Sequence, residues 1–183
     1  MNVEDNLEFF QEGLRSYVDA MRALGQFRQE VKKKAERVLT SNLQELGRAL
    51  GAPLEREKRD IYAYPAGLTN LRETEWWVTT RLRVPQFECH LGLVWLEEGS
   101  EILLFALGGF WFSDAGFRDR AKQALGGGDS ALWESSGGGL YLRERLTLEE
   151  AASFEKKLEN ILRKWIELWE KAGGLRGVQA GHS

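Results

Sequence analysis

The sequence predicts an α+β protein in which a mainly antiparallel sheet of about five to six strands packs with helices. Three observations lead to this class. A long amphipathic stripe opens the chain, short segments of alternating polarity fill its middle, and a second amphipathic stripe lies near its end. The links between the expected strands are short, with one exception, and short links join antiparallel neighbours.

Residues 6–50 form the first expected helix, because apolar residues recur there at spacings of mostly three and four. A straight helix of this length would span about 68 Å, whereas a compact chain of this size has a radius of gyration of about 16 Å. We therefore expect the helix to bend, to break, or to pack on another subunit. Gly25 and residues 40–42 are the expected break points, since Ser41 and Gln44 have the spacing of a capping box.

Strand-like segments follow Gly51 and Pro53, which end the helical region. The expected strands are residues 61–64, 75–84, 87–96 and 101–112. Side chains alternate between the two faces of a strand, so one face of the second strand carries Trp77, Thr79, Arg81 and Arg83. Gly108 and Gly109 interrupt the most apolar strand and indicate a bulge or a bend.

A short helix over residues 114–125 is expected next, with Ser113 as its N-cap. Strands over residues 130–134 and 140–146 then flank a triple glycine, which is typical of a hairpin tip.

Thr147 and Glu150 have the spacing of a capping box and open a long last helix, which Gly173 ends. The remaining residues are polar and rich in glycine, so we expect them to fray. The predicted organisation is a helical arm over residues 1–51, an α+β domain over 52–173 and a flexible tail over 174–183.

Composition narrows the function classes. The net charge of −3 creates no overall field that would attract nucleic acid or an anionic membrane. No apolar run approaches the roughly 20 residues that span a bilayer. The single cysteine, Cys89, excludes a disulfide within the chain, so we expect a cytoplasmic protein.

Glu88, Cys89 and His90 are the one place in the sequence where three reactive side-chain types meet. In a strand, Glu88 and His90 share a face and Cys89 points the other way. A metal site needs three or four convergent ligands, and the other histidine, His182, falls in the expected tail. We interpret the three residues as a core thiol beside two surface-facing polar groups, and we expect no catalytic residue, metal or cofactor.

The element order is compatible with the restriction-endonuclease-like fold, an analogy of fold alone. A nuclease site of that kind needs acidic residues and a lysine on a strand hairpin, and Glu88-x-His90 lacks the lysine. A degenerate nuclease-like, nucleic-acid-associated domain is therefore the alternative function. It would use the basic residues of the first helix or the face of Arg81 and Arg83.

Large aromatic residues alternate across both faces of the expected sheet, so either helices cover both faces or one face binds a partner. We expect a non-enzymatic, homodimeric protein-interaction module that binds a protein partner or client through this sheet face or through the first helix. The expected sheet residues are Trp77, Arg81, Arg83 and Trp111. The element order is similar to that of small acidic dimeric secretion chaperones, without a shared motif. An enzyme with a pocket of scattered polar residues is a third possibility.

Overall fold

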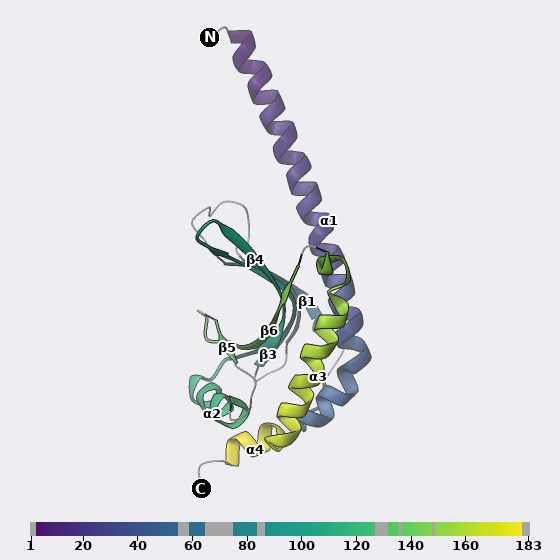
Figure 1. Cartoon of the computed structure of the whole chain (residues 1–183), viewed down its shortest axis with the longest axis vertical. Coiled ribbons are helices and arrows are strands. Elements are labelled where there is room, and N and C mark those ends of the chain that lie inside the picture. The colour runs from purple at the N-terminus through teal and green to yellow at the C-terminus, as the bar shows by residue number, and fades with distance from the viewer. Residues whose placement is uncertain are drawn as a thin grey trace.

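The computed structural model confirms the α+β class: a six-stranded, fully antiparallel sheet packs against helices, in the order β1-β2-β3-β4-β6-β5 (Figure 1). The structure describes residues 3–54, 59–64, 75–83, 87–126, 132–135, 137–147 and 149–180. Its elements are α1 (Val3–Leu50), β1 (Arg59–Tyr64), β2 (Glu75–Arg83), β3 (Phe87–Glu98), β4 (Glu101–Phe112), α2 (Ala115–Gly126), β5 (Trp133–Glu134), β6 (Leu140–Leu146), the 3₁₀ turn η1 (Glu150–Ser153), α3 (Glu155–Lys171) and α4 (Gly174–Ala180).

Helix α1 is one continuous helix, without the expected break at Gly25 or at residues 40–42. The side chains that suggested a restart bond instead to the helix's own backbone. Ser41 Oγ donates to the carbonyl of Arg37 at 3.0 Å, and Asn42 Nδ2 donates to that of Val38 at 2.8 Å. Bonds of this kind form inside a helix and not at its N-terminus, and α1 continues through these residues.

The two halves of α1 have different surroundings. From Val31 onward the apolar stripe is buried against the domain, where α1 lies alongside α3 (Figure 1). Lys34 Nζ donates to the carbonyl of Ala152 at 2.8 Å, and Arg37 pairs with Glu155 of α3 at 3.2 Å. The first half projects away from the domain as a rod.

The end of α1 follows the sequence expectation. Gly51 has φ +68°, a backbone conformation that side-chain-bearing residues rarely adopt. Its N–H donates to the carbonyl of Arg48 at 3.0 Å, and the N–H of Ala52 donates to that of Gly47 at 3.0 Å. These two bonds form a Schellman motif, which satisfies carbonyls that the helix end would leave unpaired.

The main core lies between the outer face of the sheet and the pair α1 and α3. Phe110 of β4 makes edge-to-face contacts with Trp165 and Trp169 of α3, at centroid distances of 5.0 and 5.5 Å. Trp165 Nε1 donates to the carbonyl of Gly108 at 2.8 Å, which satisfies a buried indole N–H. This bond ties α3 to the centre of the sheet.

Of the bulge or bend expected at Gly108 and Gly109, the bulge is wrong, because β4 pairs with β3 and β6 in unbroken register through both residues. The glycines serve close packing instead. A Cβ on Gly108 would lie 2.8 Å from Ile161 of α3, and one on Gly109 would collide with the backbone of β6 at Leu140 and Tyr141.

The capping box before the last helix is confirmed. The N–H of Thr147 donates to Glu150 Oε2 at 3.0 Å, and that of Glu150 donates to Thr147 Oγ1 at 3.2 Å. The box opens the short turn η1, and α3 starts after it at Glu155.

The short middle helix also starts as a capped helix, although the cap is one residue later than expected. Asp114, not Ser113, accepts the N–H of Phe117 and so caps α2. The aspartate places its carboxylate oxygen within reach of the third helical N–H.

The predicted frayed tail is wrong for residues 174–180, which form α4. Val178 is buried in the main core. A Cβ on Gly174 would lie 2.7 Å from the carbonyl of Leu50, so the start of α4 packs closely on the end of α1. Packing against α1, α2 and α3, not helix propensity, orders this segment. The rest of the expected tail, residues 181–183, lies outside the described residues.

Candidate functional site

The inner face of the sheet, opposite α1 and α3, carries a second apolar cluster. It consists of Trp77, Val94, Phe105, Leu107 and Tyr141, with Leu96, Leu103 and Trp133 packed against them. Trp77 of β2 stacks on Trp133 of β5 with ring centroids 5.4 Å apart. Four strand spacings separate β2 from β5, about 19 Å in a flat sheet. The sheet must therefore curl strongly for these rings to meet, and the curved strands of Figure 1 show this.

This curvature corrects the expectation for Trp77. The residue is only 5% exposed, and Tyr141 meets its ring edge-to-face at 4.9 Å. Sequence alternation placed Trp77 on the correct face, but curvature turns that face into an interior. The inner face is thus filled largely by its own side chains. We had expected it to be covered either by helices or by a partner protein.

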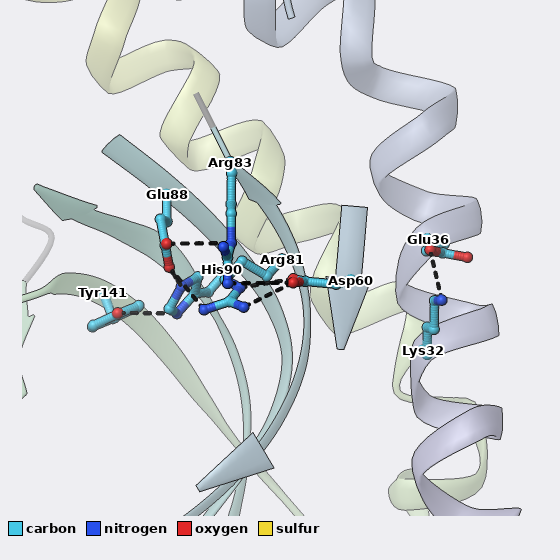
Figure 2. A network of polar contacts seen from close by, with 8 residues as sticks. All are labelled: Lys32, Glu36, Asp60, Arg81, Arg83, Glu88, His90 and Tyr141. Atoms are coloured by element: carbon cyan, nitrogen blue, oxygen red, sulfur yellow. Dashed lines mark hydrogen bonds and ion pairs between the residues drawn. The ribbon is translucent and has the colours of Figure 1, made fainter. Parts of the chain in front are cut away.

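A polar network lies beside this cluster, toward one end of the strands (Figure 2). Arg81 forms a bidentate pair with Asp60 of β1, with Nε–Oδ1 at 2.7 Å and Nη2–Oδ2 at 2.8 Å. Arg81 Nη1 also donates to Glu88 at 3.3 Å. Arg83 lies 3.4 Å from Asp60 and 3.6 Å from Glu88. Two guanidinium groups and two carboxylates therefore balance each other's charge.

His90 sits at the buried end of this network and is 4% exposed. Its Nε2 lies 3.2 Å from Glu88 Oε2, and its Nδ1 lies 3.2 Å from the hydroxyl of Tyr141. A carboxylate can only accept, so Nε2 carries the proton. The neutral ring then accepts the Tyr141 O–H at Nδ1. The neutral tautomer with its proton on Nε2 thus satisfies the hydrogen bonds among His90, Glu88 and Tyr141.

The charges around the network shift several pKa values. Burial lowers the pKa of His90 below its usual value, against the opposing effect of Glu88. The hydrogen bond from His90, together with Arg81 and Arg83, lowers the pKa of Glu88. The hydrogen bonds from Arg81 lower the pKa of Asp60. At neutral pH the network is therefore two ion pairs around an uncharged histidine.

The interpretation of residues 88–90 is correct in part. Cys89 is a core thiol, and burial raises its pKa to about 12, so it is unreactive as a nucleophile. His90 does not face the surface as expected, because the curled sheet encloses it. Both of its ring nitrogens are engaged within the protein.

The expected interaction residues Arg81, Arg83 and Trp111 do lie on the inner face, in two neighbouring cross-strand rows. Arg83, Glu88 and Trp111 are register partners across β2, β3 and β4. Trp111 is the most exposed of the expected aromatic residues, at 37%, and its Nε1 donates to the carbonyl of Gly137 at 3.1 Å. The alternation of side chains along β2 predicted this face from sequence. The pairing of Arg81 with Asp60 could not be predicted in the same way, because it depends on how β1 lies beside β2.

Two surface depressions lined by described residues offer little chemistry. One of about 450 Å³ lies between the end of α1, α2 and α4, and its charged lining residues are Asp114, Arg120 and Arg176. Asp114 already caps α2, so its carboxylate is committed to the helix. A second, of about 670 Å³, is an open trough beside the last turns of α1.

The most unusual surface is the first half of α1. We call residues 8–27 the projecting segment. Its exposed apolar side chains are Phe9 (74%), Phe10 (73%), Leu14 (65%), Tyr17 (56%), Phe27 (40%), Val18 (37%) and Met21 (37%). Phe27 meets Trp95 of β3 at 5.9 Å, and this contact marks where α1 reaches the domain.

No family model, curated protein or solved structure matches this chain. In the part of the chain that the structure describes, no group of three His, Cys, Asp or Glu side chains is arranged to hold a metal ion. Among the same residues, no helix has the length and apolar character to cross a membrane.

Replacing Trp77 with alanine should destabilise the fold by about 3–5 kcal/mol, the usual cost of removing a large buried aromatic side chain. Urea unfolding followed by circular dichroism measures this loss. Trp111→Ala is the matched control and should cost much less, because that ring is partly exposed. Equal losses from both substitutions would show that Trp77 is not interior.

Protein stability should fall as the pH drops below about 6.5, because the unfolded chain protonates His90 more readily than the folded chain does. The slope is at most about 1.4 kcal/mol per pH unit for one proton. Loss of the ionised Asp60 and Glu88 adds to it only below about pH 4.5.

Urea unfolding at pH 7.5, 6.5 and 5.5 tests this for the unaltered protein and for His90→Gln. The variant should show a flatter profile across that range. Identical profiles would mean that His90 does not titrate differently on folding.

Proposed function

We propose that this protein is a non-enzymatic protein-interaction module whose binding element is the projecting segment of α1. The observation that carries this proposal is the stripe of large apolar side chains that the segment exposes. The sheet face, the other expected binding surface, is a weaker choice because its main aromatic residue is interior. A cytoplasmic location is part of the proposal and rests on a single, buried, unreactive cysteine.

The exposed apolar area supports a binding role. Taking about 200 Å² for a large aromatic side chain, the exposed parts of Phe10, Tyr17 and Phe27 alone amount to roughly 300 Å². The largest apolar patch on a typical monomer covers about 300–600 Å² and is often functional. Phe9, Leu14, Val18 and Met21 extend the stripe beyond these three residues.

Helix energetics point the same way. Most helical stability in proteins comes from packing of the apolar face, and the apolar face of the projecting segment is largely exposed. Gly13 and Gly25 lie inside the projecting segment, and each costs about 1 kcal/mol relative to alanine. A binding partner that packs on the stripe would supply the stabilisation that the free segment lacks.

The basic residues give less support to the nucleic-acid alternative. Arg81 and Arg83 lie against Asp60 and Glu88, so their charges are balanced within the protein. On α1, Lys32 lies 3.7 Å from Glu36 (Figure 2). Phosphate binding makes affinity strongly dependent on salt, so insensitivity of binding to salt separates the two functions.

Replacing Leu14 and Tyr17 together with glutamate should abolish partner binding without unfolding the domain, because both side chains are exposed. Affinity capture with the tagged protein from a nuclease-treated lysate measures binding, and thermal unfolding measures folding. The matched control is Ser16→Glu with Gln26→Glu, which adds the same charge to exposed polar positions.

We expect bound protein, whether another chain or a second copy, to fall at least tenfold in the Leu14/Tyr17 variant and to stay constant in the control. Capture of the same proteins by both variants would refute the projecting segment as the binding element.

A further inference from the structure

We infer that the projecting segment binds the same segment of a second copy of this chain, in antiparallel orientation. This inference rests on the proposed function and identifies the partner of that surface. Its basis is the heptad pattern of the segment and the way in which α1 enters the domain.

The apolar side chains of the segment follow a seven-residue repeat. Leu14 and Met21 fall at heptad position a, and Phe10, Tyr17 and Leu24 fall at position d. The spacing of three and four alternates without a skip, which is typical of a coiled-coil seam. Arg28 occupies the next a position, so the uncharged series ends where the domain begins.

Charges are confined to the side away from the seam. Every charged residue of the segment falls at position b or f: Glu8, Glu12, Arg15, Asp19 and Arg22. Positions e and g, which flank the seam, carry only uncharged residues: Gln11, Gly13, Val18, Ala20, Gly25 and Phe27. An apolar seam with uncharged flanks favours a partner helix that is also apolar and uncharged along its contact face. A second copy of this chain presents such a helix.

The area is adequate for a pair. With about 200 Å² for each large aromatic side chain and smaller contributions from Leu14, Val18 and Met21, one stripe offers on the order of 500 Å². Two stripes together bury on the order of 1,000 Å², the lower bound for a specific interface. A dimer of moderate affinity is the expected result.

The orientation follows from the buried half of α1. The d series continues from Leu24 into Val31 and Val38, which are buried against the chain's own domain. A seven-residue repeat drifts by about 20° per heptad on a straight helix. The exposed and buried stripes therefore lie on nearly the same side of α1.

A parallel partner helix would consequently run into space that α3 already fills. Lys34 and Arg37 of α1 contact Ala152 of η1 and Glu155 at the start of α3, so that side of the helix is closed from Val31 onward. An antiparallel partner runs away from the domain and meets no such obstacle.

In the antiparallel pair, a positions of one chain face d positions of the other. Leu14 then lies opposite the partner's Tyr17, and Phe10 opposite the partner's Met21. Gly13 lies near the partner's Ala20, where small side chains let the helices approach closely. The two domains would begin about 45 Å apart along the helix axis, at 1.5 Å per residue.

Cysteine cross-linking tests both the partner and the orientation. We would prepare Phe10→Cys and Met21→Cys as separate proteins and oxidise each alone and as a mixture. Cys89 is buried and does not compete. Both replaced side chains are exposed in the free chain, so folding should not depend on them.

Antiparallel pairing predicts a cross-linked dimer in the mixture and little or none in either protein alone, since equivalent Phe10 positions lie about 16 Å apart along the axis. That separation exceeds the span of a disulfide, roughly 7 Å between Cα atoms. Cross-linking of each protein with itself would show a parallel pair and overturn the orientation.

Sedimentation equilibrium of the unaltered protein gives a second readout that needs no substitution. A monomer at every concentration would overturn the inference of a second copy. If the Leu14/Tyr17 variant nevertheless loses capture of another protein, the proposed function stands and only the identity of the partner is wrong. If that variant loses nothing, the proposed function fails as well.

Discussion

The contact on which the rest of the structure depends is the packing of the second half of α1 against α3 and the outer face of the sheet. It buries one side of α1 from Val31 to Leu50 and leaves the same side of the first half without cover. Helical continuity from Gly25 into Val31 then fixes the direction of the projecting segment relative to the domain. The exposed stripe is thus the direct continuation of the core, not a separate feature.

Curvature of the sheet is the second constraint, and it decides which side chains of the inner face are buried. Because β2 and β5 approach across the inner face, Trp77 and Trp133 stack and a compact second cluster forms. Beside that cluster, Arg81 and Arg83 balance the charges of Asp60 and Glu88. The buried His90 adopts one defined tautomer. These residue types would suggest catalysis in a sequence, yet here they satisfy one another. The apolar side chains of the projecting segment, by contrast, remain exposed.

Local signals in the sequence were sufficient for most of the fold. The alternation of β2 predicted its two faces, Thr147 and Glu150 predicted a capping box, and Gly51 predicted the end of α1. The failures share a cause: each outcome is decided by contacts between distant segments. Val178 orders α4 by packing into the core, Gly108 fits beneath Ile161, and the exposure of Trp77 depends on a strand far along the chain. The apolar length of α1 was recognisable from sequence, whereas which half remains uncovered required the domain.

Amide hydrogen exchange along α1, followed at two protein concentrations, tests the central claim most directly. Residues 31–50 should exchange slowly at both concentrations, because the domain's own core covers them. Residues 8–27 should exchange fast at the low concentration and slow markedly at the high one, since pairing of two copies covers an apolar face that is exposed in the single chain. Exchange of residues 8–27 at one rate regardless of concentration would contradict the account.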